Sequence, residues 1–449
     1  MLYDRILLAC IIAGNWALIR ILEEILPEKA LDIFPKPFAM YAVLLLSVAM
    51  AVHTAWLMFA QKRRGFFYTR FESMKKASPK ITTYPSVDIF VAVHNEEKVL
   101  ENTISNLLEL NYSNYKIYLV DDHSKDSSLK ILKNYERYYP NMIKALSLAG
   151  KRGKSAALNH AFYQSSGEYI IVFDADAFVE KDFILKMLPY LDDEGVAACQ
   201  CKKTISNYSY NFLTKLQENE YCVDSYFQCG KDLIQGNVEL RGNGQIVKRT
   251  ALLDCGLWDE ETLTDDLELS TRLHLNGWQI RFCPETEVFE QGVIDINSLI
   301  KQRLRWCEGS LRRYLVNFGK IFGTGKYTSF TQKFDSFVFL CQFAVPLWLF
   351  FDVIAEIFRY FSGEQTHLTF LMFCAFSVWL VTWVNLICGI RVYRNLSWRT
   401  SVLRAFETNI YLLSMWPTIV LLTIRKILFS RTKGTWHKTE HFSELELAE

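Results

Sequence analysis

The chain has 449 residues, with 50 lysines and arginines against 49 aspartates and glutamates, and a formal net charge of +1 at pH 7. That length exceeds one ordinary domain, and the balanced charge argues against a protein that binds nucleic acid through bulk electrostatic attraction. The 11 cysteines show no framework spacing, and the C-x-C of Cys199 and Cys201 has no second pair nearby. We therefore expect neither a disulfide scaffold nor a zinc site.

The N-terminal region, residues 1–62, predicts a hairpin of two membrane-spanning helices. Residues 38–60 form an apolar run in which His53 is the only side chain that can carry a charge near neutral pH. A helix of that length spans roughly 34 Å, enough to cross a bilayer core of about 30 Å. The basic stretch QKRRGFFYTR follows it, as expected on the cytoplasmic side. The weaker stretch 6–26 is interpreted as the first crossing, because its acidic residues do not fit a cleaved signal peptide.

The middle of the chain, residues 85–292, predicts a cytosolic α/β domain. Buried-strand patterns alternate with a helical pattern, in the order strand 87–93, helix 97–110, strand 116–122 and strand 169–176. This alternation predicts a mainly parallel sheet, in which ligands bind at the carboxyl ends of the strands. The sequence contains neither a Walker lysine loop nor a G-x-G-x-x-G motif, so we do not expect ATP or dinucleotide chemistry.

Two pairs of aspartates stand where predicted strands end. Asp121 and Asp122 follow one strand, and Asp174 and Asp176 follow another. Mg²⁺ or Mn²⁺ takes one or two carboxylates and completes its shell with substrate phosphates. Each pair taken alone also fits a solvated turn, so both interpretations stay open at this point.

The segment after the α/β domain predicts a helix on a membrane surface. Residues 293–320 repeat apolar side chains at helical spacing, with basic residues between them. This helix carries the stretch QRLRW, in which two arginines, a glutamine and a tryptophan lie close together.

The C-terminal region, residues 331–426, predicts further membrane segments. Two apolar stretches long enough to cross a bilayer cover 334–358 and 368–390. A third, 409–424, is interpreted as a re-entrant or interfacial segment broken at Pro417. A further crossing there would put the basic tail, residues 427–449, outside the cytoplasm, against the positive-inside rule. We therefore expect a multi-pass plasma-membrane protein with a cytoplasmic α/β domain.

Six motifs occur in a fixed order along the chain: VAVHNEE, VDDHS, KRGKSAALN, VFDAD, LTDDLELSTRL and QRLRW. Together they resemble the membrane-embedded branch of the family 2 glycosyltransferases, over about residues 85–320. The resemblance implies a nucleotide-sugar transferase domain of the GT-A type, inserted between transmembrane helices. It also implies a UDP-sugar donor, a divalent Mg²⁺ or Mn²⁺, and inversion at the anomeric carbon, so that an α-linked donor gives a β-linked product.

The resemblance assigns the donor site residue by residue. Donor-binding positions are Val93, His94, Glu96, Asp121, Asp122, Lys154, Asp174 and Arg305. The metal pair is Asp174 and Asp176, with Asp176 as the expected direct ligand. Lys154 precedes a predicted helix, and a helix N-terminus beside a lysine suits a diphosphate. One departure is the lack of a proline that is usual near Val93 or His94.

The resemblance makes Asp266 the catalytic base that removes the proton of the acceptor hydroxyl. The family more often has Glu at the position of Asp265. Acids in a first helical turn are also expected from the helix dipole alone, so the pattern by itself does not decide between the two interpretations.

Acceptor contacts are assigned to Gln302, Trp306 and Gly244, the last in the glycine-bearing loop 239–249. Trp258 fits a sugar contact and an ordinary core position equally well.

Two acceptor classes stay open. Several stretches are similar to cyanobacterial β-monoglucosyldiacylglycerol synthases, which favours transfer of one hexose, with UDP-glucose as the expected donor, to a diacylglycerol-type lipid. The Q-x-x-R-W signature is also shared with processive synthases of β-linked polysaccharides of the poly-N-acetylglucosamine, cellulose, hyaluronan and chitin types. A scaffold with an inactive transferase domain is not expected, because Asp174, Asp176 and Asp266 are all present. Expected partners are thus the donor, a lipid or glycan acceptor and the bilayer, without nucleic acid.

Overall fold

The structure is a computed structural model that describes residues 39–62, 84–323, 328–363, 368–429 and 442. The predicted first crossing, 6–26, and nearly all of the tail, 427–449, lie outside the described residues.

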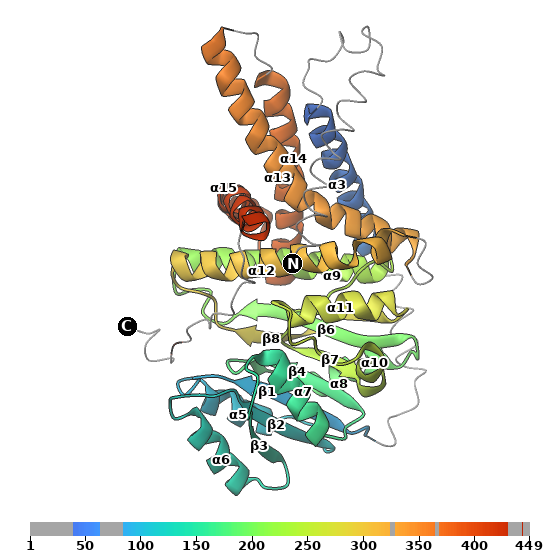
Figure 1. The fold of residues 1–449 in the computed structure, drawn as a ribbon, viewed down its shortest axis with the longest axis vertical. Coiled ribbons are helices and arrows are strands. Elements are labelled where there is room, and N and C mark those ends of the chain that lie inside the picture. The colour runs from blue at the N-terminus through green and yellow to red at the C-terminus, as the bar shows by residue number, and fades with distance from the viewer. Residues whose placement is uncertain (1–38, 63–83, 324–327, 364–367, 430–441, 443–449) are drawn as a thin grey trace.

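One eight-stranded sheet forms the centre of the α/β domain (Figure 1). Its strands are β1 (Val87–Val93), β2 (Tyr115–Asp121), β3 (Ile143–Ser147), β4 (Tyr169–Phe173), β5 (Phe178–Val179), β6 (Val196–Ile205), β7 (Gln245–Lys248) and β8 (Gln279–Glu290). Their order across the sheet is β3-β2-β1-β4-β7-β6-β8-β5. The pairs β3–β2, β2–β1, β1–β4 and β6–β8 are parallel and the other pairs are antiparallel. The predicted α/β class with a mainly parallel sheet is confirmed.

Helices cover both faces of the sheet, so its central strands are buried on both sides. Those of the α/β domain are α5 (Leu100–Leu108), α6 (Ser128–Tyr138), α7 (Lys154–Gln164), α8 (Phe183–Met187), the 3₁₀ turn η1 (Leu188–Leu191), α10 (Arg249–Cys255) and α11 (Asp265–Leu275). Alternate residues of β1 point to opposite faces: Ile89 belongs to the core of one face and Phe90 to that of the other. Trp258 packs on Phe90 and is buried, so its place is the core.

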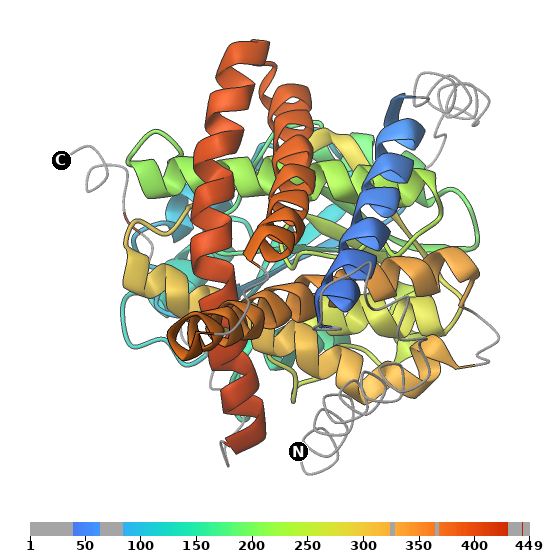
Figure 2. The same cartoon turned by 90° about the horizontal axis from the view of Figure 1, so that it is seen from above.

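Two long helices lie across one side of this domain (Figures 1 and 2). They are α9 (Phe212–Leu233) and α12 (Ile296–Phe322). The side chain of Asp295 caps α12 by accepting a hydrogen bond from the Ser298 amide at 2.9 Å. Two basic residues of α12, Arg303 and Arg313, are buried in ion pairs. They therefore face the protein and not lipid headgroups.

The remaining helices lie beyond α9 and α12. They are α3 (Ala39–Lys62), α13 (Phe330–Ser362), α14 (Leu368–Arg394) and α15 (Trp398–Phe429). Figure 1 shows α3, α13 and α14 extending away from the α/β domain, with α15 nearly end-on above α12, and Figure 2 shows α15 along its length next to α14. By length and composition, α15 is the one helix in the described part of the chain that could cross a membrane.

The predicted break at Pro417 is wrong, because α15 continues through this residue. Proline removes one backbone donor and usually kinks or ends a helix. Packing on both sides of it accounts for the continuity. Trp416 donates its indole N–H to the carbonyl of Gln342 at 2.8 Å, and Ile419 and Val420 are buried against α12 and α13.

Candidate active site

A cavity of about 880 Å³ lies where the carboxyl ends of β1, β2 and β4 meet α9 and α12. Most of the sequence-predicted site residues line it: Val93, His94, Glu96, Asp122, Lys154, Asp174, Asp176, Asp266, Gln302, Arg305 and Trp306. The same cavity is lined by apolar side chains of α13, α14 and α15, among them Phe343, Val381 and Trp416. One space therefore joins a strongly charged centre to a largely apolar region between the outer helices.

The loops after β1 and β2 form one end of the cavity. The Asp122 amide donates to the Val93 carbonyl at 2.7 Å, and His94 Nδ1 lies 2.5 Å from the Asp122 carbonyl oxygen. The carboxylate of Asp122 accepts a hydrogen bond from the Gly153 amide at 2.8 Å. Glu96 is buried, and α5 begins at Leu100 without a side-chain cap. The backbone carbonyl of Glu96 accepts hydrogen bonds from the amides of Val99 and Leu100, both at 3.1 Å, at the start of α5.

Lys154 begins α7 and reaches the centre of the cavity. Its ammonium donates to Asp174 Oδ1 at 2.5 Å and to the Gly242 carbonyl at 2.8 Å. Burial alone would lower the pKa of Lys154, but the negative charges of Asp174 and Asp265 outweigh it and raise that pKa. The lysine therefore stays cationic beside the N-terminus of α7, an arrangement that suits a diphosphate.

Asp174 and Asp176 follow β4 and both line the cavity. Asp176 Oδ2 accepts a hydrogen bond from the Gln291 amide at 2.8 Å. Within the described residues, no group of three or more His, Cys, Asp or Glu side chains is arranged to hold a metal ion. Two carboxylates beside the ammonium of Lys154 nevertheless suit a hard divalent cation, which fills its other positions with water and substrate phosphate oxygens.

Asp265 and Asp266 occupy the first turn of α11, after the N-cap residue Thr264. Burial, reinforced by the neighbouring charge of Asp265, raises the pKa of Asp266 to about 6 despite the opposing charge of Lys154. The Leu267 amide donates to Asp266 Oδ1 at 2.8 Å. A partly buried carboxylate with a pKa near neutrality suits a general base.

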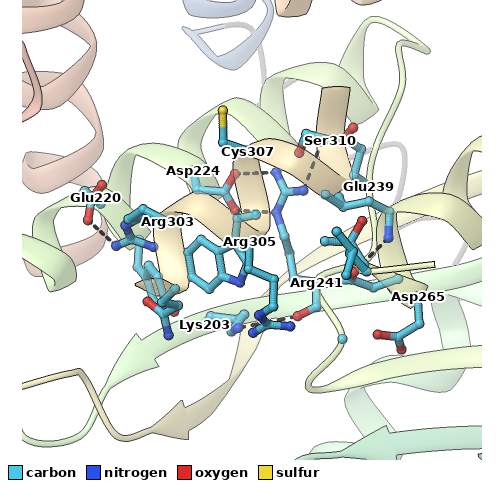
Figure 3. A pocket seen from close by; sticks show the side chains of 18 of the residues that line it. Lys203, Glu220, Asp224, Glu239, Arg241, Asp265, Arg303, Arg305, Cys307 and Ser310 are labelled. Atoms are coloured by element: carbon cyan, nitrogen blue, oxygen red, sulfur yellow. Dashed lines mark hydrogen bonds and ion pairs between the residues drawn. The ribbon is translucent and has the colours of Figure 1, made fainter. Parts of the chain in front are cut away.

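The stretch of α12 that contains the Q-x-x-R-W motif brings Gln302, Arg303, Arg305 and Trp306 to the cavity wall. Burial lowers the pKa of Arg305, and the carboxylates of Asp266 and Asp265 oppose this effect. Trp306 stacks under Arg303, whose guanidinium carbon lies 4.3 Å from the ring centroid. Arg303 in turn pairs with Glu220 of α9 at 2.5 Å (Figure 3). The motif therefore contains one arginine directed at the carboxylates and one that holds the tryptophan.

Two predicted positions do not line the cavity. Asp121 lies behind Asp122, and its Oδ1 is buried without a hydrogen-bond partner among the described residues. Gly244 packs against β6 and β8, where an added Cβ would collide with Cys201 and Val288. The glycine of this loop that lines the cavity is Gly242, and a Cβ on it would lie 3.1 Å from Asp266 Oδ2.

Several charged residues of the cavity did not emerge from the sequence: Lys203, Glu220, Asp224, Glu239, Arg241 and Glu290. Lys203 pairs with Glu290 at 2.8 Å, and Arg241 pairs with Asp224 at 2.6 Å. Two signals were available: Lys203 belongs to a pair of lysines near the end of the apolar strand β6, and Glu239 and Arg241 lie in the loop 239–249, which contains the predicted acceptor residue Gly244. The others lie on helices and loops that only the tertiary fold brings together.

A family model described as "Glycosyltransferase like family 2" matches residues 85–309. A β-monoglucosyldiacylglycerol synthase of Trichormus variabilis is 33% identical, over 89% of this chain and 83% of that protein. This chain belongs to glycosyltransferase family 2. The family predicted from the six motifs is confirmed.

This family 2 glycosyltransferase is also similar to a poly-β-1,6-N-acetyl-D-glucosamine synthase of Staphylococcus aureus, at 28% identity over 61% of this chain and 67% of that protein. Among solved structures, it is similar to the mannosyltransferase PcManGT of Pyrobaculum calidifontis in complex with GDP-Man and Mn²⁺. The TM-score is 0.58 at 18% identity, covering 86% of this chain and all of that one. This likeness shows the shared GT-A fold, which confirms the predicted fold type.

Proposed function

We propose that this glycosyltransferase transfers a glucosyl residue from UDP-glucose, in β linkage, to the hydroxyl of diacylglycerol. The observation that carries the proposal is the single cavity that joins Asp266 to apolar side chains of α13, α14 and α15. A lipid acceptor needs both ends of this cavity, the base for its hydroxyl and the apolar part for its acyl chains. The β-monoglucosyldiacylglycerol synthases among its relatives support this substrate class.

The proposed reaction uses Asp266 as the base. The hydroxyl oxygen of the lipid attacks the anomeric carbon from the face opposite the diphosphate. Asp266 accepts the proton that this hydroxyl loses. The bond from that carbon to the diphosphate breaks, and UDP leaves with the electron pair. Displacement with a single base inverts the anomeric centre, so an α-linked donor gives a β-linked glycolipid.

The cationic residues around the cavity serve the donor in this proposal. Lys154 and Arg305 bind the diphosphate, and the planar guanidinium of Arg305 suits two of its oxygens at once. Val93, His94, Glu96 and Asp122 surround the nucleoside, with Asp121 behind them. Asp174 and Asp176 would hold a divalent cation, Mg²⁺ or Mn²⁺, which when bound neutralises charge on the leaving diphosphate. The Mn²⁺ in the PcManGT complex supports a divalent ion at such a site.

In the proposed topology the α/β domain lies in the cytoplasm and the chain crosses the plasma membrane several times. The extension of α3, α13 and α14 to one side of the domain supports this orientation. So do the exposed apolar side chains on these helices, such as Leu45, Phe361 and Phe376. α15 is long and apolar enough to cross a membrane, but it packs beside α12 of the glycosyltransferase, so this proposal places it at the membrane interface.

The test is an assay of the purified full-length protein with UDP-[¹⁴C]glucose, Mg²⁺ or Mn²⁺, and dioleoylglycerol in detergent. We expect label in a chloroform-soluble monohexosyl lipid, and its loss when the metal is chelated. The same assay with UDP-N-acetyl-[¹⁴C]glucosamine examines the polysaccharide alternative. Label in high-molecular-weight, ethanol-insoluble material that forms without added lipid would overturn the proposal.

A further inference from the structure

A group of buried and partly buried ionic side chains lies on the proposed acceptor side of Asp266, between the α/β domain and the outer helices. We call this group the acceptor-side ion cluster, and its members are Asp224, Lys231, Glu239, Arg241, Arg313 and Asp335. Three helices, α9, α12 and α13, and the loop before β7 contribute its members. All of its members except Arg313 line the cavity.

Arg241 is linked to the proposed base, Asp266, through the residue that follows it in the chain. The next residue, Gly242, accepts a hydrogen bond from Lys154 and lies against Asp266. Arg241 donates through Nε and Nη2 to the two oxygens of Asp224, at 3.0 and 2.6 Å, and through Nη1 to Glu239 at 3.0 Å (Figure 3). Of the five guanidinium N–H groups, two have no protein acceptor among the described residues. The side chains of Arg241 and Asp224 remain 21% and 38% exposed at the cavity they line.

The charges of the cluster cancel. Three cations, Lys231, Arg241 and Arg313, face three carboxylates, Asp224, Glu239 and Asp335. Burial alone would raise the pKa of Glu239, but the charges of Arg313 and Lys231 outweigh it and hold that pKa well below its usual range. The charge of Arg241 likewise lowers the pKa of Asp224 against the effect of burial. Both carboxylates are therefore ionised, and each cation of the cluster already has a partner.

We infer that the Asp224–Arg241 pair selects an uncharged lipid hydroxyl over a lipid phosphate as the acceptor. A phosphate would have to lose its hydration beside ionised carboxylates, with no unpaired cation in the cluster, and burial of an unpaired charge is costly. The ester carbonyls of a neutral glycerolipid can accept the two remaining N–H groups of Arg241 without disturbing the charge balance. The inference rests on the proposed function and adds the residues that choose among membrane lipids.

The experiment compares dioleoylglycerol with dioleoyl phosphatidic acid, which differs only by a phosphate on the reacting hydroxyl. The full-length protein in phosphatidylcholine vesicles is assayed for glucosyl transfer to dioleoylglycerol in the presence of phosphatidic acid. Vesicles with phosphatidylglycerol at the same mole fraction control for surface charge. We expect phosphatidic acid to inhibit the native enzyme no more than phosphatidylglycerol does. Stronger inhibition of the native enzyme by phosphatidic acid would overturn the inference, and this outcome needs no variant.

Asp224→Asn removes one negative charge from the cluster while keeping the side-chain shape. We expect the inhibition constant of phosphatidic acid to fall about tenfold or more, equivalent to about 1.4 kcal/mol, because the loss of the Asp224 charge leaves a net positive charge at Arg241 in a partly buried site. The double variant Asp224→Asn/Arg241→Gln restores neutrality, and its inhibition should return toward the native level. If Asp224 served only to stabilise the fold, the double variant would not regain the native sensitivity to phosphatidic acid.

Asp232→Asn is the matched control, because Asp232 lies on the same helix and pairs with Arg281 at 2.7 Å but does not line the cavity. Its sensitivity to phosphatidic acid should equal that of the native enzyme. Unchanged sensitivity in Asp224→Asn, or equally raised sensitivity in Asp232→Asn, would overturn the inference.

Quenching of the cavity tryptophans by brominated forms of both lipids measures the same preference without turnover. Failure of the proposed function, seen as no glycolipid from the native enzyme, is thus distinguishable from failure of this inference.

Discussion

Gly309 of α12 lies so close to Thr264 that an added Cβ would be 2.5 Å from both the Oγ1 and the Cγ2 of the threonine. This contact joins the helix of the Q-x-x-R-W motif to the N-cap of α11. The position of Arg305 relative to Asp266 therefore depends on the lack of a side chain at residue 309. The same helix contains a second glycine, Gly319, around which there is open space.

The first prediction uses these two glycines. Gly309→Ala should separate α12 from α11, lower the melting temperature and reduce activity, since overpacking typically costs about 1–3 kcal/mol. Gly319→Ala adds the same methyl group to the same helix without a clash. It should be neutral or stabilise the protein by up to about 1 kcal/mol, because alanine is the better helix former. Equal melting temperatures and rates for the two variants would show that the Gly309 contact is unimportant.

The second prediction concerns the base. Asp266→Asn keeps the size of the side chain but removes its ability to accept a proton, so turnover should fall by about 10²–10⁴-fold. Binding of UDP, measured by calorimetry, should change little, because Lys154, Arg305 and the residues after β1 remain. A variant that retains more than about a tenth of native turnover would exclude Asp266 as the base.

The third prediction is a pH dependence with a defined sign. Asp266 must be deprotonated to accept a proton, and its pKa is raised to about 6. The value of kcat/KM should therefore be full above this pH and fall as the pH drops through about 6. The negative charge of Asp265 helps to raise that pKa, so Asp265→Asn should move the acid limb to lower pH. A limb that stays in place or moves upward would contradict the assigned coupling between these two residues.

The sequence predicted the parts of the site that lie within short motifs, and the structure shows why it missed others. Asp174, Asp176, Lys154 and Asp266 follow strands or begin helices, so local patterns indicate where they meet. Asp224 is different, because it lies inside a long helix and reaches Arg241 only through the tertiary fold.

Two further details depend on geometry that a sequence pattern lacks. Gly242 and Gly244 are separated by one residue, yet only the first lines the cavity while the second packs against the sheet. Pro417 predicts a break on local grounds, but contacts with neighbouring helices hold α15 continuous. In both cases tertiary packing, which the local sequence does not contain, decides the outcome.

The last prediction concerns how Trp306 is held. Arg303 stacks on Trp306 and is only 5% exposed, and its charge is balanced by Glu220. Glu220→Gln leaves this buried cation without a charged partner, and breaking a buried pair typically costs about 3–5 kcal/mol. Arg303 should then shift toward solvent and release the tryptophan ring, which lines the cavity beside the proposed acceptor path.

The expected result is a lower melting temperature together with a higher KM for diacylglycerol and an unchanged KM for the donor. Glu109→Gln is the control, because Glu109 forms an exposed ion pair with Lys181, and such pairs contribute about 0–1 kcal/mol. Trp306→Ala should raise the KM for diacylglycerol in the same way. Adding Glu220→Gln to Trp306→Ala should raise that KM no further, because both substitutions remove the same contact between the tryptophan ring and the acceptor. Additive effects of the two substitutions on KM would show that Glu220 and Trp306 act independently and that Arg303 does not position the ring.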